Sequence, residues 1–123
     1  MNGNNIFIDT NIAIYLLDGD RSLADILHNK RLYLSFITQL ELLGYQSITT
    51  EYEQQIKNML EHCIIVDINN QIKSEVINLK RKYSIKLPDC IVAATSIYMD
   101  TPLITSDKGF NKIEELNLIM YEK

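Results

Sequence analysis

The sequence predicts an α/β protein built on a mostly parallel sheet. Short apolar runs bounded by turn residues alternate with stretches whose apolar residues recur at helical spacing, and this alternation is typical of strand–helix–strand units. A length of 123 residues favours a single domain, residues 1–123, with one hydrophobic core. Its composition, 46% hydrophobic and 23% charged, is ordinary for a soluble globular chain.

Five apolar runs have the length and flanking residues of strands. They lie at Asn5–Ile8, Arg31–Phe36, Cys63–Ile68, Pro102–Thr105 and Leu118–Tyr121. Helical spacing links two sets of apolar residues between them: Tyr52, Ile56, Met59, Leu60 and Cys63, then Ile72, Val76, Leu79 and Tyr83.

Local signals place three helix starts. The stretch "LPDCIVAATSIYM" predicts a helix with Pro88 in its first turn, where a missing N–H costs nothing. Thr38 and Glu41 have the spacing of a capping box at the start of "TQLELLGY", and Thr50 and Glu53 repeat that spacing.

Several classes of protein are disfavoured. No apolar stretch approaches the roughly 18 residues that span a bilayer, and the start "MNGNNIFI" has no secretory pattern. Cys63 and Cys90 match no zinc or redox spacing, and the four glycines build neither a Rossmann fingerprint nor a P-loop. These observations favour a cytoplasmic protein without a membrane partner.

Four carboxylates occupy special positions. Asp9 follows the first predicted strand, Asp107 follows the fourth, and Asp89 and Glu41 fall in the first turns of predicted helices. Strand C-termini and the N-termini of the following helices share one edge of an open parallel sheet, where ligands bind. The four acids are therefore expected to meet at that edge.

Each acid also has a purely structural explanation. Glu41 would belong to a capping box, Asp89 would favour the helix dipole, and Asp9 and Asp107 would each cap a following helix. Convergence changes this balance, because clustered carboxylates repel one another unless a cation lies between them. Oxygen ligands without histidine or cysteine suit Mg²⁺ or Mn²⁺.

Such a site would hydrolyse phosphodiesters, since a bound metal activates water and stabilises charge on the attacked phosphate. Asp9, Asp89 and Asp107 would be metal ligands, and Glu41 would be a ligand, in some cases through water, or would orient the attacking water. Thr105, two residues before Asp107, could position a carboxylate or a water. Thr10 and Asn11 could bind phosphate or orient Asp9.

The net charge of −4 does not exclude a nucleic-acid substrate. Without the four acids the chain has 12 acidic and 12 basic residues, so the excess acidity belongs to the predicted site. Residues 73–86 concentrate basic side chains against the single acid Glu75; the five are Lys73, Lys80, Arg81, Lys82 and Lys86. A solvated helix face is the simplest explanation of such a run, and RNA guidance is the alternative.

Four segments together resemble PIN-domain ribonucleases, most closely VapC-type toxins of bacterial toxin–antitoxin pairs. They are "IFIDTNIAIYLL", "SFITQLELLGY", "KLPDCIVAATSIY" and "LITSDKGFNKI", in the family's order, and they span residues 6–113. The resemblance implies a three-layer α/β/α sandwich with a central, mostly parallel sheet. It also implies Mg²⁺- or Mn²⁺-dependent endoribonuclease activity, with Asp9, Glu41, Asp89 and Asp107 as the acidic set.

The same resemblance implies a homodimer and a small protein antitoxin. Thr105 and Asn11 match the family's hydroxyl before the last acid and its residue two after the first acid. A processing nuclease that is not a toxin would carry the same motifs.

Three readings from other classes remain open on the sequence alone. A receiver domain would use Asp67 as phosphoacceptor but would need an acidic pair near Asp9 and a later lysine. A haloacid-dehalogenase-type phosphatase would need a second Asp where Asn11 stands. A non-catalytic binding module would use all four acids as caps.

Overall fold

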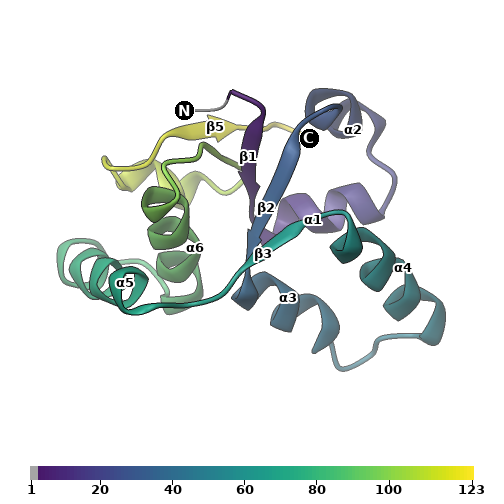
Figure 1. Cartoon of the computed structure of the whole chain (residues 1–123), viewed down its shortest axis with the longest axis horizontal. Coiled ribbons are helices and arrows are strands. Elements are labelled where there is room, and N and C mark those ends of the chain that lie inside the picture. Colours follow the sequence, from purple (N-terminus) through teal and green to yellow (C-terminus); the bar gives the residue numbers. More distant parts are fainter. Residues whose placement is uncertain (1–2) are drawn as a thin grey trace.

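The computed structural model describes residues 3–123 and has a five-stranded, wholly parallel sheet with helices on both faces (Figure 1). The strand order is β3-β2-β1-β4-β5. Its strands are β1 (Asn5–Ile8), β2 (Arg31–Ser35), β3 (Ile64–Val66), β4 (Leu103–Thr105) and β5 (Leu118–Met120). This arrangement confirms the predicted fold class, an α/β/α sandwich around a parallel sheet.

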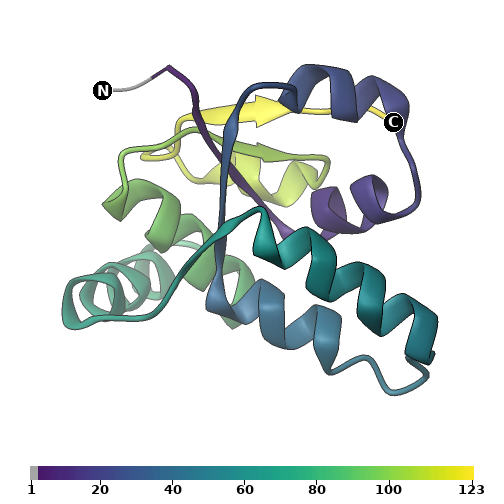
Figure 2. The same ribbon diagram turned by 45° about the vertical axis from the view of Figure 1, so that its right-hand side comes forward.

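The helices of the described residues connect these strands and form the outer layers. They are α1 (Thr10–Leu17), α2 (Arg21–Leu27), α3 (Phe36–Leu43), α4 (Thr50–Glu61), α5 (Asn70–Lys82), α6 (Leu87–Tyr98) and the 3₁₀ helix η1 (Lys108–Lys112). Helices α5 and α6 lie together on one side of the sheet, and α1, α2 and α4 lie on the other (Figures 1 and 2). Helix α3 begins at the lower edge of the sheet and contributes residues to both sides.

Alternation along the strands explains the two faces. Phe7 packs into the cluster with α5 and α6, whereas its neighbours Ile6 and Ile8 pack into the cluster with α1, α2 and α4. Leu103 and Ile104 in β4 divide in the same way, because successive strand side chains point to opposite faces. Both clusters are fully closed to solvent at Phe7 and Ile8, so β1 is the centre of the fold.

The strand order creates a switch point beside β1. From β1 the chain builds outward through β2 to β3, then crosses to the other side of β1 and builds through β4 to β5. Connections leave β1 and β4 toward different layers, and a crevice at such a point is where open α/β sheets bind ligands. Asp9 follows β1 and Asp107 lies two residues after β4, so both border this point.

Several predicted boundaries are wrong. Phe36 belongs to α3, Cys63 lies between α4 and β3, and Ile68, Pro102 and Tyr121 lie outside the strands predicted for them. Thr49, rather than Thr50, caps α4, since its hydroxyl oxygen accepts from the N–H of Tyr52.

The predicted capping box at Thr38 is also wrong. Ser35 ends β2 and caps α3 directly, accepting from the N–H of Ile37, so strand and helix join without a loop. Thr38 is consequently buried inside α3, and Glu41 lies in the second turn of that helix rather than the first.

Candidate active site

Asp9 is the most deeply buried of the four acids. It is 5% exposed, and its Oδ1 accepts from the N–H of Ile12 at 2.9 Å, which caps α1. Its Oδ2 accepts a short hydrogen bond from the Thr105 hydroxyl, itself fully buried at the end of β4. Capping therefore uses one carboxylate oxygen of Asp9 and does not exclude a second role.

Thr105 connects Asp9 to the segment that carries Asp107. Its hydroxyl oxygen accepts from the N–H of Asp107 at 3.0 Å while the hydroxyl donates to Asp9. Asp107 caps η1 through Oδ1, which accepts from the N–H of Gly109 at 2.8 Å. A Cβ at position 109 would lie 3.1 Å from this Oδ1, so glycine lets the carboxylate approach the turn closely.

Glu41 reaches the site from α3 through the first residue of α1. The Thr10 hydroxyl donates to Glu41 Oε1 at 2.6 Å and lies 3.0 Å from the hydroxyl of Thr38. Asn11 follows on the exposed side of α1. Although Glu41 lies in the second turn of α3, the hydrogen bond from Thr10 in α1 fixes the position of its carboxylate.

Asp89 lies in the first turn of α6, as predicted, and is partly buried. It lines a hollow of about 260 Å³ together with Asp107, and Lys86 and Lys112 line the same hollow. Glu41 and Thr10 border a different, mainly apolar hollow of about 330 Å³, which is also lined by Tyr45 and Tyr52.

Electrostatics join the four acids, which we call the acidic edge (Asp9, Glu41, Asp89 and Asp107). Burial raises the pKa of Asp9 above its ordinary value, and the charges of Asp107 and Asp89 raise it further, against hydrogen bonds from Thr105 and Ile12. Burial likewise raises the pKa of Asp89, helped by Asp107 and Glu41 and opposed by Lys86. Asp9 is therefore influenced by Asp107 and Asp89, and Asp89 by Asp107 and Glu41.

The acidic edge is not already a compact chelating cluster. Within residues 3–123 no three histidine, cysteine, aspartate or glutamate side chains lie close enough to hold a metal ion together. The donor set is nevertheless made only of oxygens, with two carboxylates whose charged forms are penalised by burial and by their neighbours. That chemistry fits a hard divalent cation, which would relieve the repulsion.

Sequence patterns missed three residues that shape the site. Thr38 contacts Thr10 from inside α3, where a capping role had been predicted. Ser106 donates to the hydroxyl of Tyr15 at 3.2 Å and so ties the segment before Asp107 to α1. No local pattern signals these contacts, because their partners are distant in sequence.

A receiver domain and a cysteine nucleophile are both less compatible with the geometry. Asp67 follows β3 at the edge of the sheet, with β2 between it and β1, whereas a receiver order of 2-1-3-4-5 places the acceptor strand beside β1. Cys63 and Cys90 are both free thiols, and burial raises the pKa of Cys63 to about 11, which disfavours a reactive thiolate. No helix within the described part of the chain is long and apolar enough to cross a membrane.

Solved structures of similar fold come from toxin–antitoxin complexes. One chain from "Toxin-antitoxin complex from Klebsiella pneumoniae" is 29% identical, with a TM-score of 0.82, covering 96% of this chain and 99% of that one. A chain of VapBC-1 from nontypeable Haemophilus influenzae is 28% identical, with a TM-score of 0.74 and coverage of 94% and 97%.

At 20% identity, a chain of VapBC2 from Rickettsia felis shares the fold, with a TM-score of 0.80 over 96% of this chain and 99% of that one. No curated protein matches the sequence. The model of the PIN domain matches residues 6–116, which include all four acids and every strand except β5 and the first residue of β1. The chain therefore belongs to the PIN domain family.

Proposed function

We propose that this protein is a divalent-metal-dependent endoribonuclease and the toxin of a toxin–antitoxin pair. The observation that carries the proposal is the acidic edge: its four carboxylates come from separate elements that border the switch point of a PIN fold, and the pKa values of Asp9 and Asp89 are raised by burial and by the charges of neighbouring acids. Perturbed carboxylates in a hollow at this position are typical of catalytic sites.

In this proposal Asp9, Asp89 and Asp107 hold Mg²⁺ or Mn²⁺, and Glu41 completes the site directly or through water. The bound metal would supply a water of lowered pKa and stabilise charge on the attacked phosphate. Thr105 keeps Asp9 oriented by donating to its Oδ2, and Thr10 does the same for Glu41. Asn11, exposed beside Thr10, would contact the substrate phosphate.

The proposed partners rest on similarity. The relatives from Klebsiella pneumoniae and Haemophilus influenzae come from complexes named as toxin–antitoxin and VapBC assemblies, at 29% and 28% identity. A small antitoxin protein is accordingly the proposed inhibitor, and RNA is the proposed substrate. The proposed homodimer follows from the family resemblance alone, and light scattering of the purified chain would test it.

The deciding experiment compares the wild type with Asp9→Asn and with Asp67→Asn. Asp67 is an exposed acid at the end of β3, so its substitution makes the same charge change away from the acidic edge. Each chain would be induced in bacteria without an antitoxin, with growth recorded and new RNA 5′ ends sequenced.

We expect growth arrest and new 5′ ends with the wild type and Asp67→Asn, but neither with Asp9→Asn. New 5′ ends without growth arrest would support a processing nuclease instead of a toxin. Identical RNA profiles for the three folded proteins, together with no Mg²⁺- or Mn²⁺-dependent cleavage of purified total RNA, would contradict the assignment and leave the acids as caps.

A further inference from the structure

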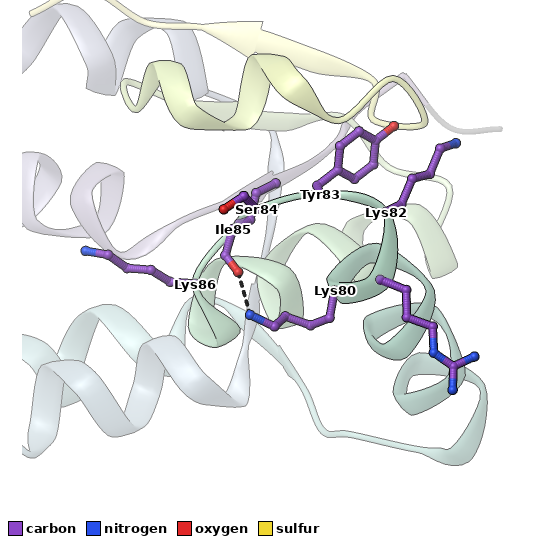
Figure 3. Close-up of a pocket in the computed structure, with 7 residues that line it drawn as sticks. Lys80, Lys82, Tyr83, Ser84, Ile85 and Lys86 are labelled. Atoms are coloured by element: carbon purple, nitrogen blue, oxygen red, sulfur yellow. Dashed lines mark hydrogen bonds between the residues drawn. The ribbon is translucent and has the colours of Figure 1, made fainter.

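The C-terminal end of α5 and the loop after it form a second hollow, larger than the one at the acids. Its volume is about 650 Å³, and residues 80–86 line it without interruption. We call it the basic cleft (Lys80, Arg81, Lys82, Tyr83, Ser84, Ile85 and Lys86); Figure 3 shows its side chains. Four of its seven residues are cationic, and no acid lines it.

The basic cleft adjoins the hollow at Asp89 and Asp107. Ser84, Ile85 and Lys86 line both this cleft and the 260 Å³ hollow that contains Asp89 and Asp107. Lys86 thus stands at the junction, close enough to Asp89 to oppose the rise in that residue's pKa. Lys112 lines the acidic side of the same junction, so cations border the two acids there.

The cations of the cleft are not equivalent. Lys80 Nζ donates to the backbone oxygen of Ile85 at 2.9 Å, which closes the loop on the helix that precedes it (Figure 3). Lys82 Nζ lies 3.0 Å from Glu115 Oε2, and Tyr83 donates to the other oxygen of Glu115 at 2.7 Å. Lys80 therefore shapes the cleft, and the charge of Lys82 is partly balanced.

Arg81 and Lys86 have a different position. Both are exposed, and in the described structure neither has a hydrogen bond or ion pair with a carboxylate. Figure 3 shows Lys86 extending from the opposite side of the loop to Lys82 and Tyr83. These two side chains can contact a ligand without first breaking an internal bond.

We propose that the basic cleft is the binding track for the phosphate backbone of single-stranded RNA, with Lys86 holding a phosphate adjacent to the one at the acidic edge. The proposal rests on the proposed nuclease function. It adds the path that the bound RNA strand follows away from the acidic edge. A cationic groove suits a polyanion rather than a neutral partner, and single-strand binders combine such a groove with aromatic side chains on which bases stack; Tyr83 is the aromatic residue of this cleft. The apolar hollow near Tyr45, beyond Glu41, lacks cations and does not suit phosphates.

The test measures binding and cleavage separately. Binding of a fluorescent single-stranded RNA would be measured in EDTA at several salt concentrations, for the wild type, Lys86→Ala, Arg81→Ala and Lys86→Arg. Arg21→Ala is the control, because Arg21 is an exposed cation on α2, on the other side of the sheet from the basic cleft. All substituted residues are exposed, and thermal melting would verify that each variant is folded.

We expect Lys86→Ala to weaken binding about fivefold and to reduce the slope of log affinity against log salt by roughly 0.7, the value for one phosphate contact on a single strand. Arg81→Ala should have a smaller effect of the same kind, and Lys86→Arg should restore the slope. Arg21→Ala should match the wild type. A duplex competitor of equal length should displace the probe less well than the unlabelled single strand.

Two outcomes separate this proposal from the function on which it rests. If the wild type cleaves RNA with Mg²⁺ but Lys86→Ala and Arg81→Ala keep the wild-type affinity and salt slope, the track is wrong and the nuclease assignment stands; an acidic segment of a protein partner would then be the better occupant. If binding depends on Lys86 but no RNA is cleaved with any divalent ion, the nuclease assignment fails and the cleft remains an RNA-binding surface.

Discussion

The centre and the rim of the acidic edge differ in how firmly the fold holds them. Asp9, at the centre, is 5% exposed and has hydrogen bonds to both carboxylate oxygens, one of them from a fully buried threonine. Glu41 and Asp107, at the rim, are exposed and sit on α3 and at the start of η1. The core thus fixes Asp9 through both oxygens, whereas the exposed rim carboxylates accept from Thr10, in the case of Glu41, and from the N–H of Gly109, in the case of Asp107.

This difference has an energetic side. Keeping Asp9 charged costs stability, because burial and the neighbouring acids raise its pKa, whereas the rim acids remain near water. A cation would offset that cost at the centre and draw the rim toward it. If Asp9 is a metal ligand as proposed, the protein gives up some stability at that position, which is common at functional sites.

The largest expected effect is on catalysis by Asp9→Asn. Replacing this carboxylate should reduce RNA cleavage by roughly a thousandfold, since it removes the charge that anchors the metal. Stability at neutral pH should stay within about 1 kcal/mol of the wild type, because removal of the buried charge offsets loss of the hydrogen bond from Thr105, which an amide Nδ2 cannot accept, while the amide oxygen can still cap α1. Cleavage rates and urea unfolding of the same preparation measure both; lost activity with a lost fold would contradict this separation.

The next effect tests the support of the central acid. Thr105→Val removes the hydroxyl that donates to Asp9 and accepts from the N–H of Asp107, and should lower the free energy of unfolding by about 2 kcal/mol. Cleavage should fall roughly 10- to 100-fold, as expected when a ligand loses its supporting hydrogen bond. Thr105→Ser keeps the hydroxyl and is the control; equal losses in both variants would mean that packing of the methyl group dominates.

The positions of three of the four acids could be predicted from sequence because they depend on local patterns. Strand periodicity placed Asp9 and Asp107 after strand ends, and Pro88 placed Asp89 in the first turn of α6. The position of Glu41 was harder to predict. Ser35 serves both as the last residue of β2 and as the cap of α3, so Glu41 lies a turn later than its spacing from Thr38 indicated.

Contacts across the fold explain the rest of what the sequence did not reveal. The bond from Thr10 to Glu41 joins residues 31 apart, and that from Thr105 to Asp9 joins residues 96 apart. Neither has a signal in the residues around it. The proximity of Lys86 to Asp89 could have been predicted, because residues three apart at a helix start lie near each other. From the sequence, Lys86 is instead interpreted as part of a basic run.

A smaller effect concerns pH. The pKa of Asp9 is raised above its ordinary value of 3.8 in the folded chain, so folding favours the protonated form. This contribution is fully present below the unfolded pKa and is lost as pH rises through the folded pKa. Relative to the wild type, Asp9→Asn should therefore gain stability as pH rises from about 4 through the raised pKa, and the gain should then level off.

Comparing the two chains at each pH removes the contributions of other groups. Asp20 and Glu115, whose pKa values are lowered mainly by hydrogen bonds from the N–H of Leu23 and from Tyr83, change stability in the opposite direction. Denaturant unfolding of both chains in EDTA at each pH would measure the difference. A difference that does not vary with pH would mean that Asp9 titrates alike in the folded and unfolded chains.

The smallest effect is expected at the wall of the basic cleft, where the groups are exposed as at the rim. Tyr83→Phe removes the hydroxyl that donates to Glu115 Oε1 and accepts from the N–H of Glu114. Lys82 still pairs with Glu115, so the free energy of unfolding should fall by less than about 1 kcal/mol. Cleavage of a short RNA should fall less than with Thr105→Val, because the Tyr83 hydroxyl has no hydrogen bond with any of the four acids. A loss of cleavage as large as that caused by Thr105→Val would mean that the cleft wall helps to position Asp89.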